Sequence, residues 1–391
     1  MEFIRKIDFG LDVLEKNDFK SYYSYVFNDE IGGLISKSQN NDFLKNKAFI
    51  INEVPSYIKT KINNSSDTIK IKTINTYSGS FINISKYNNI DLYLKKEISS
   101  QRRSTLNRCQ KRLDLCINPS YKIFYGDISR TEYNKIFNDY KLMLKRRLAQ
   151  KNSYWEELEF WEERYARTYD LINEKKASIF VIYDSDKPIS IYINSNFNDI
   201  LYIEVIAYDI DYSKFKLGFS ALVKVIEWAI LNNYKLIDMS KGDFYYKERF
   251  RNGTYYFQKH LIYDNSNLSI KLNIFILFLK LKAMYNLLPI LKKLKINKIY
   301  RSYIIRKNKN KLSTNTLENY SFSKEKIDSF NFVKSDKINI EEAKYSFLKE
   351  EFHNYLFLNF EKKTDVDIYK INDAIFFKGQ KTIQKTTVTK L

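Results

Sequence analysis

Histidine, cysteine, glycine and proline are scarce in this chain. Its 391 residues include 2 histidines, 2 cysteines, 9 glycines and 4 prolines. His260 and His353 do not combine with Cys109 and Cys116 at the spacings of a zinc site, so we expect no metal. The two cysteines fall in a predicted helix, where their spacing of about two turns, roughly 10 Å, is too long for a disulfide. We expect both to be reduced packing residues, as in a cytosolic protein.

Long uncharged apolar runs are also missing. No stretch of about 20 residues is free of charge, and the N-terminal segment carries acids among its apolar residues. The sequence therefore predicts neither a signal peptide nor a membrane span. We expect a cytoplasmic protein that is soluble or peripheral at the inner face of a membrane.

Acidic residues are outnumbered by basic ones. The chain has 66 Lys plus Arg against 46 Asp plus Glu, a net charge of +20, which favours an anionic partner. CoA, anionic lipid and nucleic acid all qualify, although no recognition-helix motif favours nucleic acid.

The basic charge is concentrated in residues 268–312, which contain twelve Lys or Arg and no acid. Apolar residues at helical spacing predict a helix there, and Pro289 should break or kink it. Such a helix suits the surface of an anionic membrane, or it packs on the neighbouring domain with its lysines solvated. The sequence leaves both alternatives open. Lys280 and Lys282 interrupt the apolar run and argue against a transmembrane span.

The stretch 201–250 has the clearest pattern in the chain. A nearly continuous apolar strand is followed by a short basic loop, an amphipathic helix and a second strand at 235–239. This order predicts a right-handed parallel crossover, and such crossovers bind ligands at the carboxyl ends of their strands. Two strands, at 178–183 and 188–194, precede it and are joined to each other and to the first strand of the crossover by turn formers. A last strand follows at 254–263. The element order predicts an α/β domain with a mixed sheet.

A second pattern lies at 91–115, which predicts a helix with a basic face. The face is either a solvated surface or a contact for a phosphate-bearing ligand or anionic surface. Further helices are predicted at 131–148 and 153–173. The basic residues of the first helix are Arg102, Arg103, Arg108, Lys111 and Arg112.

The stretch 201–250 also carries a recognisable set of residues in order and spacing. They are Tyr208-Asp209, Gly218, Asp238, Gly242-Asp243, Tyr246-Lys247 and Phe250. In these residues the stretch resembles the GNAT acyltransferases, most closely the CelD-like or BioF-like acetyltransferase domains related to the FemAB group. The resemblance implies the GNAT fold, with a mixed, mostly antiparallel sheet flanked by helices, and an acyl-CoA such as acetyl-CoA as donor. It also implies that residues 1–90 could be a degenerate first half of a tandem arrangement.

The predicted domain boundaries follow from these patterns. We expect an N-terminal α/β region, a GNAT-like catalytic domain, a basic amphipathic helical segment, and a linker with a small C-terminal α+β region. The last region should contain a helix and a hairpin with its turn at Asn372-Asp373. The four parts are 1–90, 91–264, 265–312 and 313–391.

A CoA pyrophosphate requires a backbone that donates hydrogen bonds, and a helix N-terminus supplies one. The resemblance places the pyrophosphate loop immediately before the helix of the crossover. Only one glycine occurs there, whereas the family fingerprint has two glycines or a glycine and an alanine. The predicted cofactor-binding residues are Lys216, Leu217, Gly218, Phe219 and Ser220.

Acyl transfer also needs a base for the acceptor and an acid for the leaving thiolate. Glu204 is the ionisable residue of an otherwise apolar strand, so burial would suit it as a base, although a structural ion pair is the alternative. Tyr246 of the Tyr-Lys motif is the candidate acid, with packing as the alternative. Asp243 and Lys247 would bind the acceptor or fix the turn, and Asp238 would order that turn.

The leading hypothesis is direct acyl transfer from acyl-CoA to an amine or hydroxyl. The resemblance suggests a small-molecule or glycan acceptor, as in cell-envelope or polysaccharide synthesis. One alternative is a FemAB-like transferase that uses aminoacyl-tRNA. Another is a non-catalytic module that binds a membrane or nucleic acid.

Overall fold

The computed structural model groups the chain into two compact units. The first contains Met1–Ile98, Asn194–Glu204 and Ile226–Tyr303, and the second contains Ser99–Ile193, Val205–Val225 and Ile304–Leu391. Strands β9 and β10 and helix α5 contribute to both. The structure describes residues 4–19, 22–37, 47–62, 68–151, 158, 160–242, 244–294, 320–333 and 336–390.

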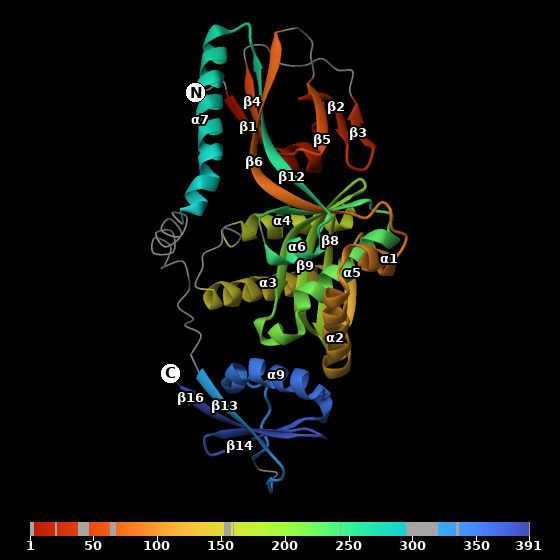
Figure 1. Ribbon diagram of the computed structural model, residues 1–391, viewed down its shortest axis with the longest axis vertical. Coiled ribbons are helices and arrows are strands. Elements are labelled where there is room, and N and C mark those ends of the chain that lie inside the picture. Colours follow the sequence, from red (N-terminus) through yellow and green to blue (C-terminus); the bar gives the residue numbers. More distant parts are fainter. Residues whose placement is uncertain are drawn as a thin grey trace. The chain divides into compact units, whose positions relative to one another are not determined.

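The first unit is built on a large sheet in which the strands run in the order β1-β4-β12-β6-β11, followed by the start of β10 (Figure 1). The β1–β4 and β10–β11 pairs are parallel, and the β4–β12, β12–β6 and β6–β11 pairs are antiparallel. The strands are β1 (Ile4–Asp8), β4 (Ala48–Pro55), β6 (Ile69–Asn83), β10 (Ile200–Tyr208), β11 (Leu236–Lys241) and β12 (Gly253–Asp264).

A smaller antiparallel sheet, in the order β3-β2-β5, also belongs to the first unit. Its apolar residues join those of β4, β12 and the π-helix Phe9–Glu15 in one core. The long helix α7 (Leu268–Lys293) packs on β6 and β12. The small sheet consists of β2 (Tyr23–Asn28), β3 (Gly33–Lys37) and β5 (Ile58–Ile62).

The second unit contains the strand order β10-β9-β8-β7, with β7 antiparallel to β8. All eight residues of β8 are buried, because helices α3 and α4 share a core with this strand. The three predicted strands are confirmed as β8, β9 and β10. The other elements are β7 (Ser120–Phe124), β8 (Ala177–Asp184), β9 (Lys187–Phe197), α3 (Arg130–Gln150), α4 (Trp161–Asn173) and α5 (Leu217–Leu231).

The C-terminal part of the second unit is a four-stranded sheet with one helix, α9 (Lys349–Asn359). The predicted hairpin is confirmed, with Asn372 in a left-handed conformation at its turn. The predicted helix from 340 is shorter than expected, since a 3-10 helix, Ala343–Leu348, precedes α9. The strands are β13 (Tyr320–Ile327), β14 (Asp367–Ile371), β15 (Ala374–Lys378) and β16 (Ile383–Lys390).

Two sequence predictions were wrong in detail. The single helix at 91–115 is two helices, α1 (Ile90–Glu97) and α2 (Ser100–Ile117), because Ile98 adopts an extended conformation and is buried. Pro289 does not break α7, which continues to Lys293, so the predicted break is wrong and the alternative, a kink, stays a prediction. The helix predicted at 153–173 is described as α4 from Trp161 to Asn173, and residues 152–157 and 159 lie outside the described residues.

The fold class is confirmed as a mixed α/β fold, with a large, mostly antiparallel sheet flanked by helices. The parallel β10–β11 pair, joined through α5, is the predicted crossover. The tandem arrangement and the four domain boundaries stay predictions.

Candidate functional site

The strands of the crossover are paired near their amino ends. Among the described residues, β10 and β11 pair from Ile200 with Leu236 to Tyr202 with Asp238. Both strands then continue, β10 to Tyr208 and β11 to Lys241. The candidate site residues of the sequence lie on the carboxyl-terminal parts of these strands and on the segments that follow them.

The loop after β10 leads into the N-terminus of α5. Lys216 takes a left-handed conformation with φ of 53°, and its carbonyl accepts the amides of Phe219 and Ser220 at 2.8 and 3.4 Å. The backbone of Gly218 is not left-handed, and a Cβ added there would meet the Tyr208 ring at an ordinary 3.7 Å. The position therefore has room for alanine, and its backbone does not demand glycine.

Two buried carboxylates and two cations fix the entry to this loop. Arg146 on α3 contacts Asp209 and Asp211 through its two terminal nitrogens, both at 2.6 Å. Lys187 on β9 contacts the other oxygen of Asp209 at 2.6 Å. Burial raises the pKa of Asp209, but the charges of Lys187 and Arg146 outweigh burial and leave that pKa lowered. We call these four residues the ion cluster.

Helix α9 supports the same loop from the C-terminal part of the second unit. The imidazole of His353 stacks on the ring of Tyr212, with 3.8 Å between the ring centroids. The Tyr212 hydroxyl donates a hydrogen bond to the Asp184 carboxylate at 2.6 Å. Lys363 contacts the same carboxylate at 2.8 Å. Burial lowers the pKa of His353 to about 3, so this imidazole is neutral at pH 7. The loop is therefore held from two sides by elements distant in sequence.

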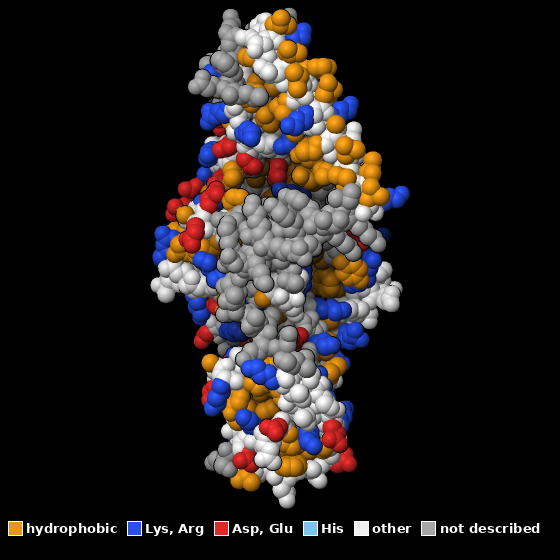
Figure 2. Space-filling view, turned by 90° about the vertical axis from the view of Figure 1, so that its left-hand side faces the viewer, with side chains coloured by type: hydrophobic (Ala, Val, Ile, Leu, Met, Phe, Trp, Pro, Cys, Tyr) orange, Lys and Arg blue, Asp and Glu red, His pale blue; other side chains and the backbone are white. Residues whose placement is uncertain are grey.

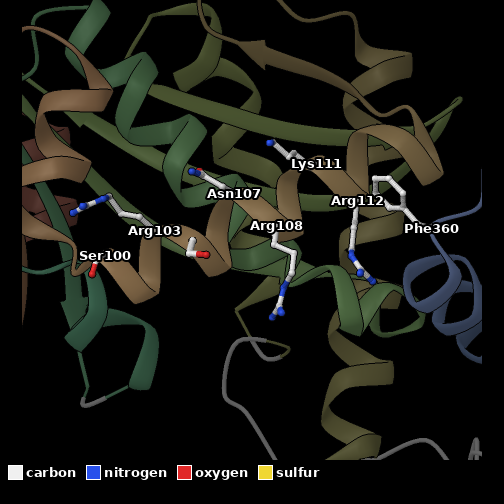
Figure 3. A pocket seen from close by; sticks show the side chains of 8 residues that line it. Ser100, Arg103, Asn107, Arg108, Lys111, Arg112 and Phe360 are labelled. Atoms are coloured by element: carbon white, nitrogen blue, oxygen red, sulfur yellow. The ribbon is translucent and has the colours of Figure 1, made fainter.

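The basic face of α2 lines a pocket of about 660 Å³. Arg108 and Arg112 project from α2 in the same direction, and Phe360 lies beside Arg112 (Figure 3). The guanidinium of Arg112 donates to the Phe357 carbonyl and lies over the Phe357 ring, which fixes its position. Four cations and three small polar side chains line this pocket, and their charge and donors would suit an anion. The lining residues are Ser100, Arg103, Ser104, Asn107, Arg108, Lys111, Arg112 and Phe360.

The opposite side of α2 carries the two cysteines, which are buried free thiols. Burial raises the pKa of both thiols, that of Cys116 to about 11. Both are therefore thiols at neutral pH, as their predicted packing role requires.

In the first unit, a buried carboxylate lies within β11. Asp238 is fully buried, and its oxygens accept the Tyr57 and Tyr255 hydroxyls at 2.7 Å and the Ser240 amide at 2.6 Å. Burial raises the pKa of Asp238 to about 6, although the hydrogen bonds oppose this shift. Beside it, the Tyr202 hydroxyl donates to the Ser240 hydroxyl at 3.0 Å. We call Asp238, Tyr57 and Tyr255 the tyrosine–aspartate cluster.

The Tyr-Lys motif lies on the short helix α6 (Tyr245–Phe250). The Lys247 ammonium is buried and donates to the carbonyls of Ser240 and Lys241 at 3.0 and 2.6 Å. In this arrangement it fixes the turn after β11. Tyr246 is half-buried, and burial raises the pKa of its hydroxyl.

Glu204 is half-buried on β10, where it accepts the hydroxyl of Ser195 from β9. Asp243 lies outside the described residues.

The comparisons with known proteins agree with this geometry. Residues 100–248 match the family model of the acetyltransferase (GNAT) domain, which covers α2 through most of α6. The chain carries a GNAT acyltransferase domain. The resemblance found in the sequence is therefore confirmed. No curated protein matches the chain at a significant level.

Three solved structures are similar to parts of this chain at low sequence identity. L-PGS from Bacillus licheniformis is 12% identical, with 56% of this chain and 69% of that chain covered and a TM-score of 0.37. FemX is 11% identical, with coverages of 56% and 72% and a TM-score of 0.30. PaiA N-acetyltransferase from Thermoplasma acidophilum, in complex with coenzyme A, is 14% identical, with coverages of 36% and 98% and a TM-score of 0.26. Because the identities and TM-scores are low, we draw no functional conclusion from these three structures.

The predicted site residues of the GNAT domain fall into two groups. Glu204, Tyr246 and Lys247 belong to the first unit, whereas the loop 216–220 belongs to the second. Within the described residues, no three His, Cys, Asp or Glu side chains are grouped so that they could hold a metal ion.

Sequence reasoning missed the partners of the key carboxylates. Tyr57 precedes Asp238 by 181 positions, and Arg146 precedes Asp209 by 63. The sequence did contain one signal, an aspartate in or directly after each of these apolar strands. A carboxylate that is buried there needs hydrogen-bond donors or cations from elsewhere in the fold.

Proposed function

We propose that the GNAT domain transfers an acyl group from an acyl-CoA, with acetyl-CoA as the first candidate, to an amine or hydroxyl. The observation that carries this proposal is the family match over residues 100–248, which includes the ends of β10 and β11 and the N-terminus of α5. The ion cluster and α9 support it, because they hold the loop before α5 in a fixed conformation.

The donor would bind through its phosphates. The amides of Leu217 and Gly218 open the first turn of α5, where the helix dipole favours a pyrophosphate. Lys214 and Lys216 are exposed in the same loop and supply positive charge. The basic face of α2 belongs to the same unit, and α2 packs on the 3-10 helix Ile210–Phe215 of this loop. It would add cations for a further phosphate of the same ligand.

The chemistry requires one bond to form and one to break. The acceptor nitrogen or oxygen attacks the thioester carbonyl carbon, and the C–S bond then breaks to release the thiolate. Glu204 is the proposed base for the acceptor proton, and Tyr246 is the proposed acid that protonates the thiolate. Asp238 and Lys247 are positioning residues, because their side chains form hydrogen bonds with backbone groups of the segment that lies between them in sequence.

The proposed acceptor is a small molecule or a glycan of the cell envelope. A transferase that takes its group from aminoacyl-tRNA is the second candidate, because the four cations of the α2 pocket suit an extended phosphate backbone. A thermal shift with acetyl-CoA but not with tRNA supports the first candidate, and the opposite result supports the second.

The test of donor binding is a calorimetric titration with acetyl-CoA and with desulfo-CoA. Gly218→Glu places a carboxylate against the phosphate, so we expect at least a 100-fold loss of affinity, about 3 kcal/mol. Gly218→Ala is the matched control, since the site has room for its methyl group. Equal affinity of the glutamate variant and the wild type would show that the pyrophosphate binds elsewhere. The non-catalytic alternative gains if Glu204→Gln and Gly218→Glu leave cellular function intact while deletion of 268–312 abolishes it.

A further inference from the structure

Helix α7 has two apolar faces, and the sheet covers one of them. Ile270 and Ile274 are buried against Ala48, Leu261 and Tyr263 of strands β4 and β12. Leu277, Phe278, Leu281 and Tyr285 continue this contact along the helix. This inner face accounts for the docking of α7 on the first unit.

The outer face is equally apolar but exposed. Its side chains recur at spacings of three, four or eleven residues, which places them on one side of a helix at about 100° per residue. That side lies half a turn away from Ile270, Ile274 and Leu281. The exposed fractions are large: Leu268 77%, Leu272 57%, Ile276 56%, Leu279 49% and Ile290 54%. We call these five residues the outer stripe.

Lysines accompany the outer stripe, and no acid does. Lys271, Lys280, Lys282 and Lys293 are exposed on α7, and the sequence through residue 312 contains only basic charge. The face that carries α7 shows hydrophobic side chains interspersed with Lys and Arg (Figure 2). An apolar stripe bordered by lysines matches a bilayer with anionic headgroups, because the lysines reach the headgroups while the stripe enters the acyl boundary.

The contacts of α7 with the sheet favour a helix that lies on a membrane over one that crosses it. By length and composition alone, Leu268–Leu291 is sufficient to cross a membrane, in spite of Lys280 and Lys282. Crossing would require the inner face to leave the sheet, which would expose Ile274 and Leu261, both fully buried. It would also separate the Lys72 ammonium from the Phe278 ring, 4.8 Å away. Lying in the interface keeps these contacts.

We propose that α7 lies flat in the surface of an anionic membrane, with the outer stripe inserted and the lysines at the headgroups. The first unit would then be held at the cytoplasmic face of that membrane. The inference concerns a surface away from the proposed catalytic residues and does not depend on the acyl-transfer proposal.

The test is flotation of the full chain with phosphatidylcholine vesicles, with or without phosphatidylglycerol. We expect binding only with phosphatidylglycerol, and at least a tenfold loss in the double variant Leu272→Glu, Ile276→Glu, since two apolar side chains no longer insert. Lys280→Ala and Lys282→Ala should each weaken binding about fivefold. The matched control is Leu231→Glu on α5, which also alters an exposed leucine and should bind like the wild type.

Three results would overturn the proposal. The first is no binding to phosphatidylglycerol vesicles. The second is bound protein that resists extraction by alkaline carbonate, since a spanning helix resists and an interfacial one is released. The third is light scattering that shows a dimer broken by the double variant without any vesicle binding, because a second copy would then cover the outer stripe. An unchanged melting temperature in the double variant rules out unfolding as the cause of lost binding.

Discussion

Two buried aspartates lie on the crossover, one within β11 and one directly after β10, and they have different partners. Asp238 within β11 accepts hydrogen bonds from the neutral hydroxyls of Tyr57 and Tyr255. Asp209 after β10 is paired with Arg146 and Lys187. Both carboxylates order the segment that follows them, since each also accepts a backbone amide two residues on.

The difference shows that the partner of a buried carboxylate, and not burial alone, sets its pKa. Burial raises the pKa of both groups, and it prevails at Asp238, where the donors are mostly neutral. At Asp209 the charges of two cations outweigh the effect of burial, so the pKa of this group is lowered. The contributions of the two aspartates to the stability of the fold should therefore change with pH in opposite directions.

The largest expected effect comes from breaking the ion cluster. Arg146→Ala leaves Asp211 without its partner and Asp209 with only Lys187, so the free energy of unfolding should fall by about 3–5 kcal/mol. Urea unfolding measures this loss. Lys176→Ala removes an exposed ion pair with Glu174 as the control and should cost at most about 1 kcal/mol. Similar losses in the two variants would mean that the ion cluster contributes no more than a surface pair.

The next effect distinguishes the two aspartates by pH. A carboxylate whose folded pKa is raised stabilises the fold fully below its unfolded pKa, and this stability is lost as pH rises through the folded pKa. For Asp238 the ordinary pKa is 3.8 and the folded pKa is about 6. As pH rises across this range, the free energy of unfolding of the wild type should fall by about 3 kcal/mol relative to that of Asp238→Asn. Urea unfolding of both proteins from about pH 4 to pH 7 measures the difference.

The matched variant Asp209→Asn should show the opposite sign. Because the folded pKa of Asp209 is lowered, its stabilisation is present above the ordinary value and is lost as pH falls toward the folded pKa. Parallel pH profiles for the two variants would contradict the comparison.

A smaller effect is expected from displacing one tyrosine of the tyrosine–aspartate cluster. A Cβ added at Gly79 on β6 would lie 2.3 Å from the Tyr255 ring, so Gly79→Ala must push that ring away from Asp238. We expect a loss of about 1–3 kcal/mol in urea unfolding. Gly33→Ala is the control, since nothing lies within 4 Å of its added Cβ. If the two variants were equally stable, Tyr255 would be free to move without cost.

The sequence predicted the parts of the fold that depend on neighbouring residues. The strands β8 to β12 and helix α5 follow from alternation, helical spacing and turn formers, all of which act over a few residues. The pairing of β6 with β11 and β12 has no local signal, because the partners lie far away along the chain. The same reason hid Tyr57, which reaches Asp238 only through that sheet.

The candidate site was predicted in part for a similar reason. The loop 216–220 was found because a glycine and two lysines precede an amphipathic helix within seven residues, Lys214 to Ser220. The supports of this loop, Arg146 on α3 and His353 on α9, pack on it from other elements, and nothing near them in sequence indicates the contact. The roles of the loop 216–220 and of Glu204, Tyr246, Asp243 and Lys247 stay predictions.

The long strand β6 has a consequence for synthesis on the ribosome. Its partner β12 begins at Gly253, which is 170 positions after the end of β6 at Asn83. At 5–20 residues per second, roughly 9–34 s pass between the emergence of the two strands. Its other neighbour, β11, begins only at Leu236, so both edges of a 15-residue strand stand open to other chains for most of that interval. The N-terminal region is therefore the first part of its unit to be made and among the last to be protected.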